Sequence, residues 1–552
     1  MSINYSLSKT ANNRDLVDQE NAIVPWVRNP LWMTMPDISS IGTQRVVGLY
    51  RIDNNENNFI ALSVQAQGAT PNGVTVDWGD GTVQSFITNN TLTNIQYKYN
   101  YNTIGDSSTS NSGNASTLGY KQVIVSIIPS GSAGVELVGF RQDVRHTQSS
   151  LSNFNSKWLE FIVNASGLVN LSLGDSSNNT LPTYLESAII LNKVSDSIGI
   201  GMSSLFRFCY SLKNVILPNT SLLTNTSFFD NCSSLEYAPF YDSSNATTGP
   251  FFNTCTSLKY VPPYDTRKVT AMNSMFQACC SLKTIPFFDT SKVTNMSNMF
   301  EGCSCLESVP PFDTRSCTNM LNMFRSASRL KQVPLFNTSG VTNMGNMFFQ
   351  AFSVQNIPPF DTSKNTTFQN FAYLATSITG AGPFNLASAT RADFMFGNCG
   401  LLKTMPILTN TSGVTNMNAM FQFCRNLEAV SGLDTRSVNN FTGMFNSCTK
   451  LRIVSGLNMS ASGVTTGYNA TIGNINNMFN GCISLETIDG SGLSASINLG
   501  GLCLSSGALN NIYTNLLNSG VPNGTTIVVT NNWGAVTSTT SIATSKGWTV
   551  VT

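Results

Sequence analysis

The stretch DTSKVTNMSNMFEGCSCLESVP, residues 289–310, is one copy of a repeat that runs through about half of the 552-residue chain. In each copy a Phe is followed after three residues by a modest apolar residue and, in most copies, after six by Leu. Successive copies lie 23 to 25 residues apart, except for a step of 34 before the last one. The twelve copies are marked by Phe206, Phe229, Phe252, Phe276, Phe300, Phe324, Phe348, Phe371, Phe396, Phe421, Phe445 and Phe479. A fixed period of this length predicts a solenoid of stacked coils, called rungs below.

Each repeat contains a strand candidate and a return segment. Residues 306–309 place two apolar residues around two polar ones, and Pro310 limits this strand because proline lacks the N–H that a ladder needs. Residues 293–300 space Val, Met, Met and Phe three or four apart, which predicts one or two turns of 3₁₀ or α-helix, preceded by a chain turn at Asp289. The pattern is that of a mainly β leucine-rich-repeat solenoid, whose methionines fill the core rather than bind copper.

Nine of the thirteen cysteines occupy one position of the repeat, three residues after the Phe. Alanine or leucine fills this position in the other copies, so the site favours a small or modest apolar side chain. We therefore expect a column of buried free thiols, with disulfides between rungs as the alternative. Cys279-Cys280 and Cys303-x-Cys305 lack the spacing of zinc ligands.

Composition restricts the class of partner. The chain carries 30 Lys and Arg against 29 Asp and Glu, and only 11% of its residues are charged, so we expect no nucleic-acid binding. Its many Asn, Ser and Thr residues suit an exposed particle surface or hydrogen bonding to sugars, or simply fill β-turns. No signal-peptide core and no run of about 18 apolar residues is found, which predicts no membrane insertion and a chain kept in a cytoplasm until it is released.

The first 42 residues are expected to form an extended arm, in which Trp26 and Trp32 anchor the chain to another subunit or to its own next domain. Residues 43–140 change to a β pattern, with strand candidates at 46–52, 58–65, 74–78, 82–87 and 121–128, and with a surface loop at 106–118. The sequence Asp77-Trp78-Gly79-Asp80-Gly81-Thr82 predicts a tight hairpin whose carboxylates serve the turn, with calcium binding as the alternative.

Three further segments complete the chain. Residues 141–204, with strand candidates at 158–163 and 185–190, are expected to form an N-terminal cap of irregular repeats before the repeats proper at 205–490. Residues 491–552 predict a closing β-α cap, with helices near 508–517 and 541–547 and strands at 525–530 and 548–551.

The repeat units DTSKVTNMSNMFEGCSCLESVPPFDT and TSGVTNMGNMF resemble BspA-like leucine-rich repeats, also known as DUF285 repeats, which occur in bacterial and mycoplasmal surface proteins and adhesins. The DWGDGT hairpin resembles that of PKD-type immunoglobulin-like β-sandwich domains. The order of arm, PKD-like domain, BspA-like repeats and a cap ending in SIATSKGWTVV is similar to virion-associated proteins of tailed bacteriophages. The resemblance implies binding and display, not catalysis.

Few residues offer catalytic chemistry. His146 is the single histidine, so neither a Ser-His-Asp triad nor a multi-histidine metal site is available, and the acids are scattered at repeat turns. We predict no enzyme activity, no cofactor and no metal site.

A binding surface is expected on the strand face, where a charged or polar residue follows each repeat Leu. Tyr237, Tyr260, Lys259 and Lys283 are the candidates for stacking on and hydrogen bonding to a glycan or protein receptor. The alternative is a solvated sheet surface with neutralising charges. This column contains Lys213, Glu236, Lys259, Lys283, Glu307, Lys331, Gln355, Lys403, Glu428, Arg452 and Glu486.

The function that these features suggest is that of a phage virion component, in a tail fibre, a tail or the capsid surface, which displays the repeats for host attachment. We expect it to assemble in the host cytoplasm, to contact other virion proteins through its N-terminal region, to be a homo-oligomer in the particle and to be released by lysis. A bacterial cell-surface adhesin is the main alternative, and a glycan-degrading enzyme is the third.

Overall fold

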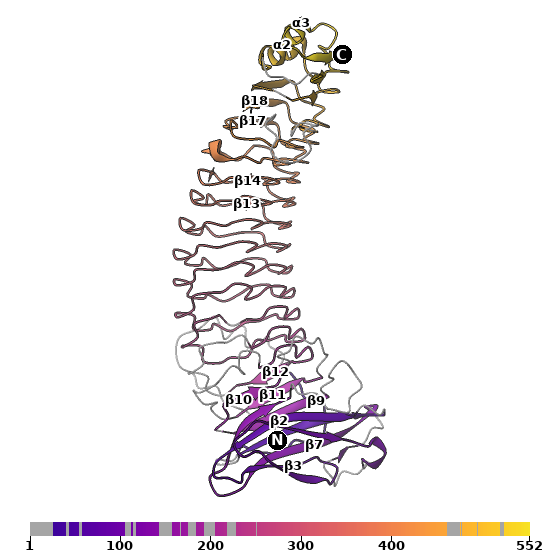
Figure 1. The fold of residues 1–552 in the computed structure, drawn as a ribbon, viewed down its shortest axis with the longest axis vertical. Coiled ribbons are helices and arrows are strands. Elements are labelled where there is room, and N and C mark those ends of the chain that lie inside the picture. Colours follow the sequence, from indigo (N-terminus) through magenta and orange to yellow (C-terminus); the bar gives the residue numbers. More distant parts are fainter. Residues whose placement is uncertain are drawn as a thin grey trace.

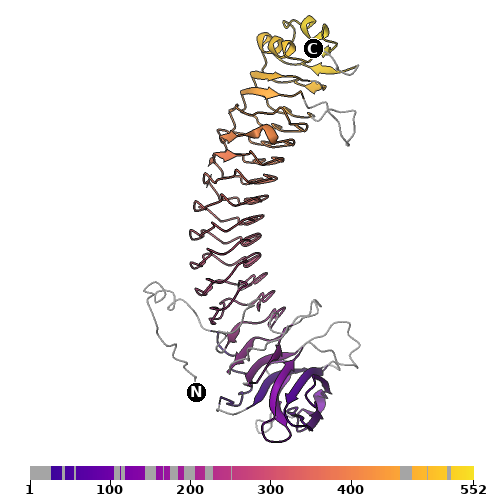
Figure 2. The ribbon, with the colours of Figure 1, turned by 60° about the vertical axis from the view of Figure 1, so that its left-hand side comes forward.

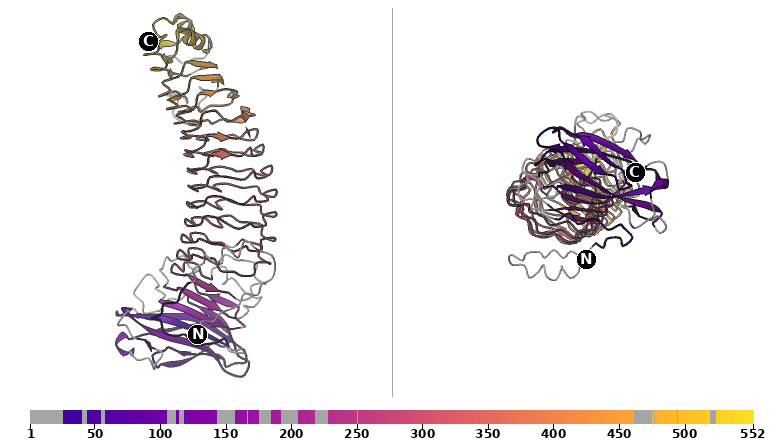
Figure 3. Two further views of the ribbon diagram at one scale, coloured as in Figure 1. Left: turned by 180° about the vertical axis from the view of Figure 1, so that it is seen from behind. Right: turned by 90° about the horizontal axis from the view of Figure 1, so that it is seen from below.

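The chain forms an elongated stack of coils between a broad N-terminal base and a C-terminal cap (Figures 1 and 2). Seen from below in Figure 3, the coils largely superpose on one another. The computed structural model describes residues 26–39, 44–54, 58–104, 112–113, 118–142, 157–165, 167–174, 184–191, 205–217, 228–249, 251–460, 475, 477–493, 495–518 and 524–552.

Two sheets form the base. The 8-stranded sheet has the order β12-β11-β9-β1-β7-β3-β4, with β6 paired to β7, and the 4-stranded sheet has the order β10-β8-β2-β5. The strands of the first sheet are β12 (Asn214–Ile216), β11 (Ser187–Ile190), β9 (Trp158–Asn164), β1 (Arg45–Asp53), β7 (Tyr120–Ser130), β3 (Gly73–Asp77), β4 (Val83–Ile87) and β6 (Ser112–Gly113). Those of the second are β10 (Asn170–Ser172), β8 (Glu136–Arg141), β2 (Phe59–Gln67) and β5 (Thr93–Lys98), which precedes the 3₁₀-helix η1 (Tyr101–Thr103).

The strands predicted at 46–52, 58–65, 74–78, 82–87 and 121–128 are confirmed as β1, β2, β3, β4 and β7. Strands β5 and β8 were not predicted. The loop expected at 106–118 needs a correction, since β6 lies within it and pairs Ser112 with Val123 of β7; the rest of that loop up to residue 117 lies outside the described residues.

The large sheet continues from the base into the repeats. β1 pairs antiparallel with β9, β9 pairs parallel with β11, and β11 pairs parallel with β12 of the first repeat. The segments 43–140 and 141–204, expected as two units, therefore share one sheet. A single hydrophobic cluster extends from Val46 in β1 to Trp548 in the cap, so the base, the repeats and the cap form one core.

The short strand expected in every repeat is mostly absent. Residues 306–309 form no strand, and only one backbone bond reaches the preceding rung at this level, from Glu307 N–H to the Lys283 carbonyl at 3.0 Å. The prolines that follow remove further donors. Within the described repeats, paired strands occur only in β12 with β11 of the base, β13 (Asn356–Ile357) with β14 (Gly380–Ala381), β15 (Phe384–Asn385) with β16 (Leu408–Thr409), and β17 (Ala429–Val430), β18 (Ile453–Asn458) and β19 (Thr487–Ser491).

The helical return segment is also corrected. In the 289–310 repeat, Asn295 forms an isolated parallel bridge with Asn319, and the chain then turns without forming a helix. The N–H groups of Met296 and Phe300 donate to the next rung, whereas that of Met299 donates three residues back to Met296. Asn298 has φ 57°, a left-handed value that ends any helical run. The one helix among the described repeat residues is the 3₁₀-helix η3 (Thr411–Gly413).

The core consists of stacked side chains, as predicted. Phe276, Phe300 and Phe324 are fully buried and stack at centroid distances of 5.8 Å, with Met296 and Met299 buried beside them. All nine cysteines of the repeat position are buried and no disulfide is present, which confirms the free-thiol column. These residues are Cys209, Cys232, Cys255, Cys279, Cys303, Cys399, Cys424, Cys448 and Cys482.

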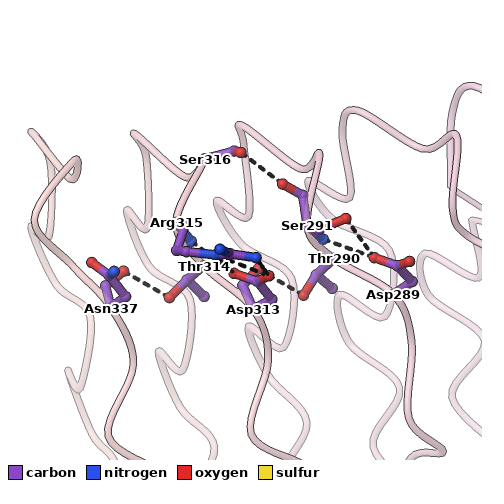
Figure 4. A network of polar contacts seen from close by, with 8 residues as sticks. All are labelled: Asp289, Thr290, Ser291, Asp313, Thr314, Arg315, Ser316 and Asn337. Atoms are coloured by element: carbon purple, nitrogen blue, oxygen red, sulfur yellow. Dashed lines mark hydrogen bonds and ion pairs between the residues drawn. The ribbon is translucent and has the colours of Figure 1, made fainter.

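A polar ladder links the turns of neighbouring coils. The Asp289 carboxylate accepts from the Ser291 N–H at 3.0 Å, and the pKa of Asp289 is lowered, chiefly by the Ser291 hydroxyl bond (Figure 4). The buried Thr290 hydroxyl donates to the Asp313 carbonyl of the next rung at 2.9 Å, and Thr314 continues the ladder to the next coil (Figure 4). The predicted chain turn at Asp289 is therefore confirmed.

The two helices and two strands predicted for the C-terminal cap are found, although α2 (Ser506–Thr514) ends before residue 517 and β20 (Ile497–Asn498) was not predicted. The cap also contains β21 (Thr526–Val528), α3 (Ser541–Thr544) and β22 (Thr549–Val551). The Ser505 hydroxyl caps α2 by accepting from Ala508 N–H at 3.2 Å. Leu509, Ile512 and Tyr513 turn the apolar side of α2 toward the last rungs.

Candidate functional site

The charged column of the strand face is neutralised between neighbouring rungs. Five ion pairs join residues one rung apart, with N···O distances of 2.8 to 3.6 Å. They are Lys213–Glu186, Lys259–Glu236, Lys331–Glu307, Lys403–Glu428 and Arg452–Glu486. Apart from the half-buried Glu186, these side chains are well exposed, so solvent screens the pairs and each adds little stability. Much of this face is therefore a solvated surface with neutralising charges, which is the alternative considered from the sequence.

Two of the four candidate residues lie side by side. Tyr237 and Tyr260 form a parallel backbone bridge, and both side chains are half-buried. Lys259 precedes Tyr260, and its Nζ lies 2.8 Å from Glu236 Oε2, a hydrogen bond that raises the pKa of Lys259. Aromatic residues occupy this position in these two rungs, whereas the next rungs carry Thr284 and Ser308. The structure therefore brings Tyr237, Tyr260 and Lys259 together.

Lys283 occupies the next rung of the same column and is exposed. No ion pair joins it to another described residue; the acid one rung on, Glu307, pairs with Lys331 instead. The combination of two neighbouring aromatic rings, one paired ammonium and one unpaired ammonium can stack on a sugar ring or peptide side chain and donate hydrogen bonds to its oxygens.

The aromatic pair of the arm is packed on the chain's own base. Trp32 is 5% exposed, lies in a small cluster with Val47 of β1 and Leu159 of β9, and donates its indole N–H to the Tyr120 hydroxyl at 3.2 Å. Trp26 contacts it with ring centroids 6.2 Å apart. This is an intramolecular contact, one of the two arrangements considered from the sequence. The arm leaves Val27 76% and Leu31 51% exposed.

In the DWGDGT hairpin both carboxylates are engaged. Asp77 accepts from Gly79 N–H at 2.9 Å, and Asp80 accepts from Thr82 N–H at 3.0 Å and from the Tyr97 hydroxyl at 2.8 Å. The Trp78 ring stacks on Tyr97 at 4.8 Å and is buried. These contacts stabilise the turn.

Within the described residues, no group of three or more His, Cys, Asp or Glu side chains is placed to hold a metal ion. His146 lies outside the described residues. No helix in the described part of the chain has the length and apolar character to cross a membrane.

Two features of this surface were not predicted. One is the ion pair of Glu236 with Lys259. The sequence could have predicted it, because Glu236 occupies the same column position one rung before Lys259. The other is a line of exposed apolar residues, five positions after the repeat Leu, which we call the apolar stripe. In the sequence this line is visible as recurring Pro-Phe and Pro-Pro dipeptides, whose prolines were interpreted only as the ends of strands. The apolar stripe consists of Phe240, Pro263, Phe287, Pro311, Leu335, Pro359, Pro383 and Ile407.

Comparison with known proteins adds the family. The family model described as "Mycoplasma protein of unknown function, DUF285" matches residues 201–305, 245–332, 304–406 and 390–491, which together cover more than half of the chain. No curated protein matches the chain.

Solved structures with similarity include a leucine-rich repeat protein from Bacteroides ovatus, at 15% identity and TM-score 0.29, covering 65% of this chain and 91% of that one. The structure of a TLR13–ssRNA13 complex matches at 15% identity and TM-score 0.22, covering 67% and 49%. The plant receptor RGFR1 in complex with RGF2 matches at 12% identity and TM-score 0.21, covering 76% and 70%. These likenesses concern the fold alone. On the family match, the chain belongs to the DUF285 family and is a BspA-like leucine-rich-repeat protein.

Proposed function

We propose that the chain is a non-enzymatic structural protein of a bacteriophage particle, in a tail fibre, a tail or the capsid surface, that displays its repeats for attachment to the host. The observation that carries this proposal is the unbroken core from Val46 to Trp548, which joins base, repeats and cap into one long body. A body of this kind suits a spacer that holds one end away from the other (Figure 1). The family's surface and adhesion proteins support the attachment role.

In this proposal the base attaches the chain to other virion proteins. We assign to it an immunoglobulin-like, PKD-type character, supported by the DWGDGT hairpin and the packing of Trp78 on Tyr97. Because Trp26 and Trp32 hold the arm to the base, Val27 and Leu31, the exposed large apolar side chains among the described arm residues, are the ones offered to a neighbour. The protein would assemble in the host cytoplasm as a homo-oligomer of the particle and leave by lysis, with no role in nucleic-acid binding or membrane insertion.

The repeats would bind a host surface glycan or protein at Tyr237, Tyr260, Lys259 and Lys283. A direct test measures binding of the labelled full chain to cells of the host bacterium. We expect Tyr237→Ala with Tyr260→Ala to weaken binding at least about tenfold, since aromatic anchors carry much of the binding energy at interfaces.

The matched control is Lys331→Ala with Lys403→Ala, two positions of the same charged column that lack the tyrosine pair. It should bind like the unchanged protein. Tyr237→Phe with Tyr260→Phe keeps the rings and should retain most of the binding. Equal binding by the alanine and unchanged proteins would remove these residues from the receptor site.

A bacterial cell-surface adhesin is the second candidate, favoured by the family match. Antibody labelling decides between the two: the chain on purified phage particles supports the virion role, whereas the chain on uninfected cells supports the adhesin. New reducing ends after incubation with host polysaccharide would instead reveal a glycan-degrading enzyme and contradict the proposed absence of catalysis.

A further inference from the structure

The apolar stripe runs along eight successive rungs. Its large members are strongly exposed, with Phe240 at 65%, Phe287 at 63%, Leu335 at 63% and Ile407 at 66%. The prolines between them, Pro263, Pro311, Pro359 and Pro383, are also exposed. Parallel coils repeat every ~4.8 Å, so the stripe is roughly 34 Å long.

The stripe stands on a rigid floor. The residue after each stripe position is a buried aromatic or Leu, and Phe312, Phe336 and Phe360 stack there with centroids 6.1 and 6.0 Å apart. A proline precedes seven of the eight stripe residues, and its ring fixes its own φ. The exposed side chains are therefore held in a fixed row.

Contacts within their own turns fix the acidic side chains that border the stripe. The carboxylates two residues beyond it are held by their own turns: Asp265 pairs with Arg267 at 2.7 Å, Asp313 pairs with Arg315 at 2.7 Å, and Asp289 accepts from Ser291. Two of these three carboxylates are neutralised by an arginine, which favours an apolar partner surface over a charged peptide.

The exposed apolar area is a large part of what a protein interface needs. A Phe side chain presents about 150–250 Å², so the exposed fractions of Phe240 and Phe287 give roughly 100–160 Å² each. The six members from Phe240 to Pro359 offer on the order of 500 Å², at the upper end of the usual size of an apolar patch on a monomer. Polar residues that flank the stripe would supply the rest of the ~800 Å² per partner of a standard interface.

The order of large and small residues identifies the partner. From Phe240 to Pro359 the six stripe positions alternate strictly between a large side chain and a proline. A two-fold axis between the rungs of Phe287 and Pro311 places every large residue against a proline: Phe240 faces Pro359, Phe287 faces Pro311, and Leu335 faces Pro263. A row with the same ~4.8 Å repeat is available on another copy of the solenoid.

We propose that the apolar stripe is a self-association surface that pairs two copies of this chain side by side and antiparallel. A parallel pair is disfavoured because large side chains would meet large ones and prolines would meet prolines, which leaves uneven gaps. The antiparallel pair points one base in each direction, so the pairing is a property separate from the proposed attachment to a particle.

The first test is sedimentation equilibrium of the full chain at micromolar concentrations in 1 M salt. We expect a dimer, whereas Phe287→Ser with Leu335→Ser should dissociate at least roughly tenfold more readily. The control, Leu401→Ser with Ile483→Ser, removes exposed apolar side chains of the repeats that lie off the stripe, at 51% and 60% exposure, and should remain dimeric. Thermal melting of each variant verifies that the fold is retained.

The second test fixes the register by thiol crosslinking, with the unchanged chain as the background. Pro263→Cys mixed with Leu335→Cys should give a crosslinked pair, and Pro263→Cys alone should not. A monomeric unchanged chain, or a stripe variant that dimerises normally, would overturn the proposal, and self-crosslinking of Pro263→Cys would overturn the antiparallel register. If the unchanged chain is monomeric and the stripe variant loses binding to host cells, the stripe serves a host partner and the proposal is wrong.

Discussion

At the scale of single residues, the cysteine column does more than fill space. Each of the nine thiols donates to a backbone carbonyl of the preceding coil, as Cys303 Sγ does to Phe276 O at 3.0 Å and Cys448 Sγ does to Phe421 O at 3.0 Å. Position and burial of these cysteines were predictable, because Ala327 and Ala351 share the site. The hydrogen bond from each thiol could not be predicted, because it depends on the direction of a backbone carbonyl in the preceding coil.

A different buried thiol offers a test by pH. Cys317 takes the repeat position that Val293 and Val341 occupy in the neighbouring rungs, and burial raises its pKa from 9.0 to about 11. The thiol ionises at a lower pH in the unfolded chain than in the folded one. Its contribution to the free energy of unfolding is therefore fully present below about pH 9 and is lost as the pH rises toward 11. By pH 10.5 the loss through this one group is about 2 kcal/mol.

We therefore expect Cys317→Val to match the unchanged protein at pH 7 and to be the more stable of the two at pH 10.5. Urea unfolding at both pH values measures the difference, and the tyrosines, which also ionise in alkali, affect both proteins alike. A difference that stays constant between the two pH values would contradict the assigned burial.

At the scale of the element, the repeating unit follows hydrogen bonds between coils more than local helix preference. Apolar residues spaced three or four apart predicted a helical return at 293–300, yet alternate N–H groups there bond to the next coil and Asn298 takes a positive φ. Similarly, β5 escaped prediction because Ile95 is its one buried side chain, and β8 because it is completed by β2 and β10 from elsewhere in the chain. Hydrogen-bonding partners that are distant in sequence determine the secondary structure of these segments.

The hydrogen bonding between two neighbouring coils depends at one place on the buried side chain of Asn365. At Asn365, where other repeats carry mainly Val, the amide oxygen accepts from Met344 N–H at 2.9 Å and the amide nitrogen donates to Thr367 O at 2.8 Å. In neighbouring rungs this bond is direct, as from Met320 N–H to Asn343 O at 2.9 Å. Asn365 is fully buried, so it replaces a backbone contact within the core.

Asn365→Ala should lower the free energy of unfolding by about 1–3 kcal/mol, because two buried backbone groups lose their partners. Thr366→Ala, the exposed neighbour whose hydroxyl donates to Thr342 O at 3.0 Å, should change stability by less than about 1 kcal/mol. Chemical denaturation of both variants provides the comparison. Equal decreases in the free energy of unfolding would mean that the Asn365 amide does not stabilise the contact between these two coils.

At the scale of the whole molecule, hydrophobic packing crosses every boundary that the sequence suggested, and the large sheet crosses two of them. Composition shifts located the arm, the base, the repeats and the cap, but pairing of β1 with β9 could not be read from them, because the two strands are far apart in sequence. Removal of residues 1–140 would expose an edge of β9 and part of the core, so attachment is better tested by point changes at Val27 and Leu31. The candidate tyrosines were predictable as neighbours, since a constant repeat length places equivalent positions side by side.

The central claim, that the chain is one continuous stack of coils, is tested most directly by counting reactive thiols. Ten cysteines are buried, and Cys280, Cys305 and Cys503 are partly exposed. Brief alkylation of the undenatured protein, followed by peptide mass spectrometry, should modify these three and reach the other ten only after denaturation. Rapid modification of Cys303 or Cys424 in the native protein would contradict the stacked core.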